Sequence, residues 1–196
     1  VLAADLVPEG DQPEVLDDLL RTQSRVNETL TALVGLATGE VADGSARTSV
    51  DLTELVHRVA TEAARTHPGL RVTQWPGPPA PAVVLVAGLV LALTNLVTNA
   101  VRHGGAGEVR LGARTVDGGV ELVCDDDGCG IPDFERTAVL TRFVRGSSAS
   151  APGSGLGLAL VVQQAQLHGG AVLITDSPLG GARVLLGWPA QPFSAA

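Results

Sequence analysis

Two asparagines, Asn95 and Asn99, stand four residues apart in an otherwise apolar stretch, which places them on one face of a helix. Carboxamide oxygens are hard, neutral ligands that suit a Mg²⁺ ion already carrying phosphate charge. Arg102, about one turn further on, has the charge to meet such a phosphate. Taken alone, the motif fits equally well an asparagine pair that caps a helix or is satisfied within the core.

Three consecutive acidic residues, Asp125 to Asp127, follow an apolar run and precede Gly128 and Gly130. Glycines let the backbone approach a flat ligand closely, and a fixed carboxylate can accept a hydrogen bond from an exocyclic amine such as that of adenine. A calcium loop of the EF-hand type is disfavoured, because it places its ligands on alternate residues and closes with a distant glutamate. A polar turn after a strand is the common alternative.

A glycine-rich loop, Gly153 to Leu158, follows a run of small residues and opens a helix. This arrangement presents free backbone N–H groups and the positive end of the helix dipole to phosphate. The two common phosphate-binding fingerprints do not fit, because Leu158 stands where the dinucleotide motif has its third glycine and the chain has no lysine for a P-loop. By itself the loop is also compatible with a flexible connection.

The elements that must position these motifs follow from hydrophobic periodicity and end signals. Three helices are predicted: one from the Asp51 N-cap to about residue 66, one through the apolar segment that ends near residues 103–105, and one over 156–167. His168 would then lie at a helix C-terminus, where a cation is mildly favoured. Strands are predicted over 70–75, 108–115, 120–124, 171–176 and 182–188, the last four as two hairpins. Residues 76–81, with four prolines, are expected to be an irregular connection, and residues 132–154 an irregular stretch ending in a mobile lid.

The first part of the chain has a different pattern. Residues 13–37 have helical spacing with a broad apolar stripe, and residues 1–7 look like the end of a preceding helix. We therefore expect a partial dimerisation hairpin over 1–39 with its first helix truncated, a linker over 40–50, the main domain over 51–191 and a tail over 192–196. An uncovered apolar stripe implies a partner helix, such as that of a second copy of the chain.

Composition narrows the classes of function. The chain has 196 residues, 45% of them hydrophobic, and fits one compact domain with a modest extension. Its net charge of -8 without a basic run argues against nucleic acid and an anionic membrane as partners. Cys124 and Cys129 match neither a zinc pattern nor a disulfide framework, which favours a reduced, cytoplasmic setting. The longest apolar run, residues 82–93, is too short to span a bilayer and suits a buried core segment. The absence of methionine suggests that the chain is a piece of a longer protein.

The order and spacing of the three motifs together resemble the catalytic domain of sensor histidine kinases, in the wider ATPase group that includes gyrase, Hsp90 and MutL. Residues 95–103 match the N box of that family, 126–130 the G1 box, 142–145 the end of the F box and 153–158 the G2 box. A narrower likeness, to one actinobacterial member, rests on residues 21–25 and 163–170. The resemblance implies a Bergerat-type ATP-binding fold. This is an α+β, two-layer sandwich in which helices cover one face of a mixed sheet, here preceded by a helical hairpin segment.

The resemblance also implies Mg²⁺-ATP as the ligand. Asn99 would coordinate Mg²⁺, Asp126 would recognise the adenine amine, and the loop backbone would contact phosphate. The implied catalytic pair is Asn95 and Asn99, and the implied nucleotide-binding set is Asn99, Arg102, His103, Asp126, Gly128, Gly130, Ile131, Phe143, Arg145, Gly146, Gly153, Ser154, Gly155, Leu156, Gly157 and Leu158. Leu140 departs from the family pattern, because the F box usually has its first Phe there.

Asn95 separates relatives within the group, because hydrolysing members place a glutamate there to activate water, and asparagine cannot act as that base at neutral pH. Slow hydrolysis and transfer to a protein histidine are therefore expected. None of the four histidines has the family's acceptor context, so the acceptor is expected upstream of Val1. A response regulator would receive the phosphoryl group, and the parent would form a homodimer through the hairpin. An anti-sigma-factor serine kinase and a non-catalytic nucleotide-binding or dimerisation module are the alternatives.

Overall fold

The computed structural model describes residues 47–144, 146 and 155–189, so the expected hairpin over 1–39 and the tail over 192–196 lie outside the described residues. Within them the elements are β1 (Thr48–Asp51), α2 (Leu52–Thr66), β2 (Arg71–Gln74), β3 (Pro81–Val84), α3 (Val86–Arg102), β4 (Glu108–Val116), β5 (Gly119–Asp126), the 3-10 turns η3 (Asp133–Glu135) and η4 (Ala138–Leu140), α4 (Gly157–Leu167), β6 (Ala171–Asp176) and β7 (Ala182–Pro189). Every helix in this part of the chain falls short of the length and apolarity needed to cross a bilayer.

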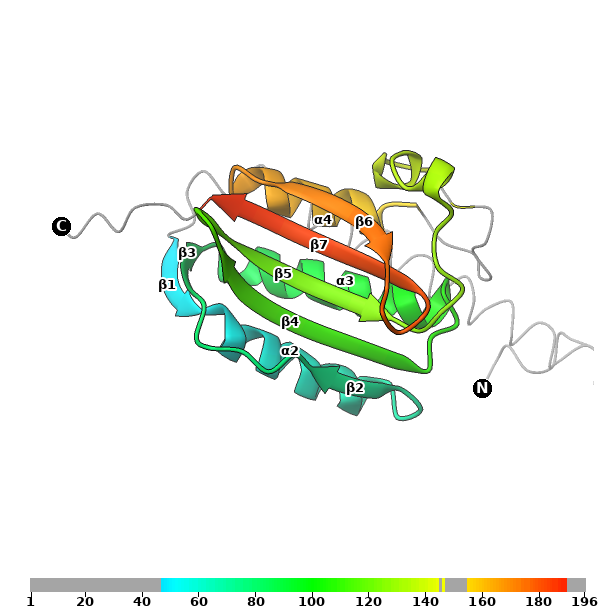
Figure 1. The fold of residues 1–196 in the computed structure, drawn as a ribbon, viewed down its shortest axis with the longest axis horizontal. Coiled ribbons are helices and arrows are strands. Elements are labelled where there is room, and N and C mark those ends of the chain that lie inside the picture. Colours follow the sequence, from blue (N-terminus) through cyan, green and yellow to red (C-terminus); the bar gives the residue numbers. More distant parts are fainter. Residues whose placement is uncertain (1–46, 145, 147–154, 190–196) are drawn as a thin grey trace, which may run out of the picture.

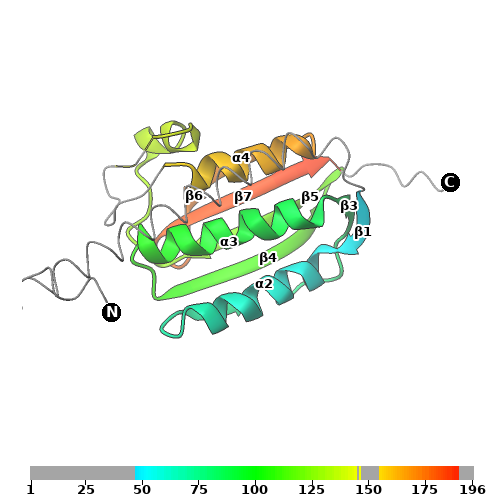
Figure 2. The same ribbon diagram turned by 180° about the vertical axis from the view of Figure 1, so that it is seen from behind.

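Five strands form the main sheet, in the order β2-β4-β5-β7-β6. The β2–β4 pair is parallel and the other three pairs are antiparallel, so the sheet is mixed. Helices α2, α3 and α4 all cover the same face of this sheet, which is seen from its open side in Figure 1 and from its helix side in Figure 2. The predicted α+β sandwich with helices on one face is confirmed.

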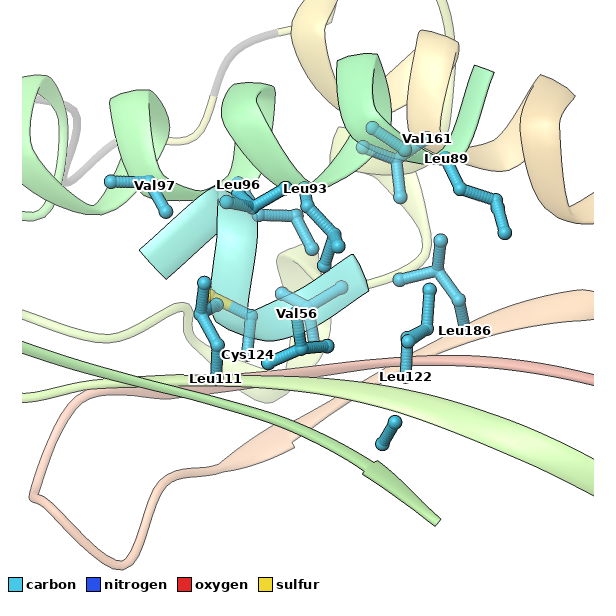
Figure 3. Packing of buried hydrophobic residues seen from close by; sticks show 14 of the residues in the cluster. Val56, Leu89, Leu93, Leu96, Val97, Leu111, Leu122, Cys124, Val161 and Leu186 are labelled. Atoms are coloured by element: carbon cyan, nitrogen blue, oxygen red, sulfur yellow. The ribbon is translucent and has the colours of Figure 1, made fainter. Parts of the chain in front are cut away.

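The core lies between this sheet and its three helices, and α3 covers the middle strands. Strand alternation sends Leu111 of β4, Leu122 of β5 and Leu186 of β7 to the helix side, where each is fully buried. They face α3, whose Leu93 and Val97 are also buried (Figure 3). Burying each such side chain contributes about 1.5–3 kcal/mol, so this layer fixes how α3 is rotated against the sheet.

Two short strands were not expected. β1 pairs with β3 in a separate two-stranded antiparallel sheet, so Thr48–Val50 of the predicted linker are strand. Residues 76–81 were predicted to be an irregular connection, but the last of them, Pro81, begins β3. The apolar run 82–93 is divided between β3 and α3. β1 lies in a polar stretch of small residues, and β3 runs directly into the apolar segment of α3, so neither has a strand pattern of its own. Proline is tolerated at the first residue of a strand.

His168 follows α4 as predicted, but its environment differs from that of an exposed cation. The ring is 1% exposed, and its Nε2 accepts a hydrogen bond of 3.0 Å from the backbone N–H of Leu85. Nε2 must therefore be unprotonated, and the proton on Nδ1 is donated to the carbonyl of Gln164 at 2.7 Å. Burial lowers the pKa of His168, so the ring is a neutral link between α4 and the chain entering α3.

We predict that His168→Gln removes a pH-dependent part of the free energy of unfolding. The pKa of His168 is lower in the folded than in the unfolded chain, so the unfolded state binds more protons between the two values. This stability is fully present above the unfolded value of about 6.5 and is lost as the pH falls below it. Urea unfolding at neutral and mildly acidic pH should show a smaller acid loss in His168→Gln than in the wild type or in the exposed-site control His57→Gln. Equal losses in all three would contradict this account.

Candidate functional site

The predicted motifs meet at one end of the sandwich. The C-terminal end of α3, the end of β5, the start of α4 and the turn between β6 and β7 all lie at the right-hand end of the molecule in Figure 1 and at the left-hand end in Figure 2. Segments that are far apart in the sequence therefore surround one region. Their contacts fall into three groups.

The first contact joins the N box to the G2 box. Asn95 and Asn99 are half-buried on the side of α3 that faces α4. The Nδ2 of Asn95 donates to the carbonyl of Leu91 at 2.9 Å, one turn back in the same helix. A Cβ placed on Gly157, the first residue of α4, would lie 3.0 Å from Asn99 Oδ1 and 3.4 Å from Asn95 Oδ1. Both carboxamides thus lie against the N-terminus of α4, where backbone N–H groups and the helix dipole favour an anion such as phosphate.

The second contact joins the end of α3 to the G1 box. Arg102 lies in the last turn of α3, and the backbone N–H of His103, at the C-cap, donates to the carbonyl of Asn99. The next residue, Gly104, accepts a 2.9 Å hydrogen bond at its carbonyl from the N–H of Cys129. A Cβ on Gly128 would lie 2.6 Å from the same carbonyl oxygen, so the two backbones pack without room for a side chain.

Asp127 strengthens this second contact. Its Oδ1 accepts the N–H groups of Gly107 and Glu108, each at 2.8 Å. The carboxylate thereby ties the loop after α3 to the segment after β5. Sequence reasoning did not assign a role to Asp127 separate from that of its neighbours. The run of three acids was the only available signal, and it does not say which carboxylate faces which partner.

The third contact surrounds Asp126, which ends β5 and is 8% exposed. Its Oδ1 accepts the backbone N–H of Gly128 at 2.9 Å and that of Ala182, at the start of β7, at 3.1 Å. Burial raises the pKa of the Asp126 carboxyl, and these two N–H groups act in the opposite direction. Both bonds use the same oxygen, which leaves Oδ2 for a ligand.

Asp125 points to the other side of the sheet. It is fully buried there and binds the Arg183 guanidinium through both oxygens, at 2.6 and 3.0 Å, and the Trp75 indole N–H at 3.1 Å. The three consecutive acids therefore do not converge. No cluster of three or more His, Cys, Asp or Glu side chains suited to a metal occurs among the described residues.

Phe143 and Gly155 hold together the two ends of the segment between them. The Phe143 N–H donates to the Gly155 carbonyl at 2.9 Å, and a Cβ on Gly155 would lie 2.9 Å from Phe143 Cα. Both residues have positive φ, 66° and 68°. The Phe143 side chain is 74% exposed. This predicted nucleotide-binding aromatic therefore adjoins the G2 box through its backbone.

The other predicted residues that the structure describes have mainly packing and backbone roles. Leu156 is buried with Leu160 in a small cluster against Leu91 of α3, whereas Leu158 and Ile131 pack on the main core. Gly130 has a φ of 71°, which suits glycine, and Gly146 lies near Glu135. Leu140, at the departure from the family pattern, also packs on the core. Arg145, Gly153 and Ser154 lie outside the described residues.

Comparison with known proteins agrees with this geometry. The family described as histidine kinase-, DNA gyrase B- and HSP90-like ATPase matches residues 85–192, more than half of the chain. The sensor-type histidine kinase PrrB of Mycobacterium leprae is 52% identical over 186 residues, which are 95% of this chain and 42% of that protein. The histidine-protein kinase/phosphatase MprB of Mycolicibacterium vanbaalenii is 35% identical over 185 residues, covering 91% of this chain and 37% of that protein. The chain thus spans less than half the length of these relatives.

Solved structures show the same relationship. The crystal structure of the ATP-binding domain of PrrB from Mycobacterium tuberculosis is 47% identical, with a TM-score of 0.66 over 74% of this chain and 98% of that one. Full-length ShkA in complex with AMPPNP is 28% identical, with a TM-score of 0.65 over 86% of this chain and 38% of that one. Residues 21–25 and 163–170 predicted a likeness to one actinobacterial kinase, which is PrrB. The matches to mycobacterial PrrB confirm that prediction. The chain belongs to the histidine kinase-, DNA gyrase B- and HSP90-like ATPase family, as a catalytic ATP-binding domain of the sensor histidine kinase type.

Proposed function

We propose that this chain binds Mg²⁺-ATP at the junction of α3, α4 and the end of β5, and passes the γ-phosphoryl group to a histidine on another part of the parent kinase. The observation that carries the proposal is the approach of Asn95 and Asn99 to Gly157 at the start of α4. This approach puts neutral oxygen ligands beside free helix N–H groups, which is what a Mg²⁺-bound triphosphate needs.

Asp126 supplies the base-binding end of the site. Its free oxygen, Oδ2, is an acceptor when the carboxylate is ionised, and the exocyclic amine of adenine is a donor. The glycines on either side of Cys129 keep side chains away from the surface that a flat base would cover. An AMPPNP complex of the relative ShkA supports a nucleotide of this kind.

The donor set fits a magnesium ion that arrives with the nucleotide. Asn99 Oδ1 is the protein ligand we assign, and the phosphates would supply the charge that carboxamides lack. Bound Mg²⁺ would neutralise charge that develops on the phosphate oxygens during transfer. The N–H groups at the start of α4 would orient the phosphates, and Arg102, in the last turn of α3, would add positive charge nearby.

Asn95 favours transfer over hydrolysis. Its amide group donates to the Leu91 carbonyl, so the side chain is held by its own helix. A carboxamide cannot take a proton from water at neutral pH, so the site lacks a general base at this position. Because the relative PrrB is a sensor-type histidine kinase, we assign the chain to a cytoplasmic part of a membrane-anchored, homodimeric sensor that passes its phosphoryl group to a response regulator.

A transfer assay tests this proposal. The chain, labelled ATP and a separate protein domain carrying the parent's acceptor histidine should yield acid-labile phosphohistidine. Asn99→Ala should lower the yield and the ATP affinity by at least about tenfold, which is about 1.4 kcal/mol. The control Thr94→Ala, an exposed position on α3, should change neither. Normal ATP binding without phosphohistidine would contradict the kinase function, and phosphoserine in its place would favour the serine-kinase alternative.

The substitution Gly157→Ala is expected to weaken nucleotide binding while leaving the stability of the fold almost unchanged. The added methyl would press on the Asn99 carboxamide at 3.0 Å and shift it from its position, so we expect ATP affinity to fall by about tenfold in calorimetry. Stability should change by less than about 1 kcal/mol, because Gly157 is the first residue of α4, where alanine and glycine differ less in helix propensity than in a helix interior. The control is Gly69→Ala, where a Cβ meets nothing within 4 Å. Unchanged affinity in Gly157→Ala would show that the α3–α4 contact does not form the phosphate end of the site.

A further inference from the structure

Helices α3 and α4 lie side by side on the sheet and run antiparallel (Figure 2). Gly88, near the start of α3, packs against Gln164, near the end of α4. Asn99, near the end of α3, lies against Gly157 at the start of α4. Gly157 and Gln164 are about two helical turns apart along α4. The contact outside the proposed nucleotide site thus shares a helix with the contact inside it.

The Gly88–Gln164 contact is as close as a residue without a side chain allows. A Cβ on Gly88 would overlap Gln164 Oε1 and would lie 2.7 Å from Gln164 Cδ. Gln164 is 3% exposed, so its amide has little room to move aside in the packed interior. A larger residue at position 88 would therefore push the two helices apart at this end.

Electrostatics and hydrogen bonds hold Gln164 in this place. Among the described residues its Oε1 has no hydrogen-bond partner, but it lies beside the first turn of α3, where Leu85 provides no side-chain cap. The positive end of the α3 dipole favours an oxygen there. The Gln164 carbonyl accepts the Nδ1 proton of His168, whose Nε2 accepts the Leu85 N–H. The end of α4 is therefore tied to the start of α3 through both the side chain and the backbone of Gln164.

Leucines fill the space between the two contacts. Leu156 and Leu160 are buried and pack with Leu91 of α3. Such a packed apolar layer resists compression, so a change in helix spacing at the far end is passed along α4 to Gly157. The Asn99 carboxamide lies so close to Gly157 that a small displacement alters its position relative to the N–H groups of α4.

We propose that Gly88 and Gln164 are positioning residues whose contact sets the spacing of α3 and α4, and through it the phosphate end of the nucleotide site. This inference rests on the proposed nucleotide function. Both residues lie at least about two helical turns from the Asn99–Gly157 contact, so they act on the ligand only through the helices. The base-binding end, at Asp126, is held by β5 and β7 instead. The contact should therefore affect binding of the magnesium-bound triphosphate but not of the base.

Gly88→Ala tests the inference with two ligands. Mg²⁺-ATP needs both ends of the site, whereas adenosine carries the base and ribose without phosphates. We expect the affinity for Mg²⁺-ATP to fall by about tenfold in calorimetry, and the affinity for adenosine, from NMR titration, to change by less than about twofold. A merely structural defect would reduce the binding-competent fraction and lower both affinities by the same factor. Equal losses, or wild-type affinity for both ligands, would overturn the inference.

A compensating substitution provides the second test. Gln164→Ala alone removes the spacer and should lower the Mg²⁺-ATP affinity by about threefold, again without affecting adenosine. In the double variant Gly88→Ala/Gln164→Ala, the methyl at position 88 no longer meets the amide, so the affinity should recover to within about threefold of wild type. Independent effects would instead multiply to about thirtyfold, which would contradict a role for the contact.

The control is Gly69→Ala, where a Cβ meets nothing within 4 Å, and it should match the wild type in every measurement. If Gly88→Ala does not fold, Gln164→Ala decides alone, because it removes the contact without adding bulk. A wild-type ratio of the two affinities in Gln164→Ala would then overturn the inference. Failure of the wild type to bind Mg²⁺-ATP would instead overturn the proposed function on which the inference rests.

Discussion

The packing of α3 on the middle of the sheet is the constraint on which the other features depend. Leu93 and Val97 bury their side chains among the sheet leucines, which fixes the rotation of the helix. Residues that lie about 100° or more around the α3 axis from Leu93 and Val97 then face α4. Gly88, Asn95 and Asn99 form a stripe on this side of the helix. A Cβ on Gly88 would overlap the Gln164 side chain of α4, so the same stripe allows close helix contact at one end and holds the carboxamides at the other.

The base-binding end depends on a different balance. A carboxylate as buried as that of Asp126 loses hydration, and it is stable only where hydrogen-bond donors replace the lost water. Backbone N–H groups from two separate strand ends fill this need at one oxygen. Glycines permit the approach, because Gly128 lies against Gly104 and Gly181 lies against Asp126 with no room for a Cβ. Glycines near the site therefore bring backbones together as well as turning the chain.

Local patterns predicted most of the elements, because long helices and hairpins repeat their signals over many positions. Two of the elements predicted in this way are α3, which carries Asn95 and Asn99, and α4, which starts at Gly157. Contacts that depend on tertiary structure were not predictable. Ala182 lies 56 residues from Asp126, and nothing in its residue type marks its N–H as a partner. The neutral state of His168 likewise depends on a donor 83 residues away.

The central claim is that three separated segments form one Mg²⁺-nucleotide site. Titrating the isotope-labelled chain with Mg²⁺-AMPPNP and following the amide resonances tests it most directly. We predict that the shifts concentrate in residues 95–103, 126–130 and 155–158, with little change at Trp75 and Leu173 on the open face of the sheet. Shifts confined to one of the three segments, or centred on the open face, would contradict the account.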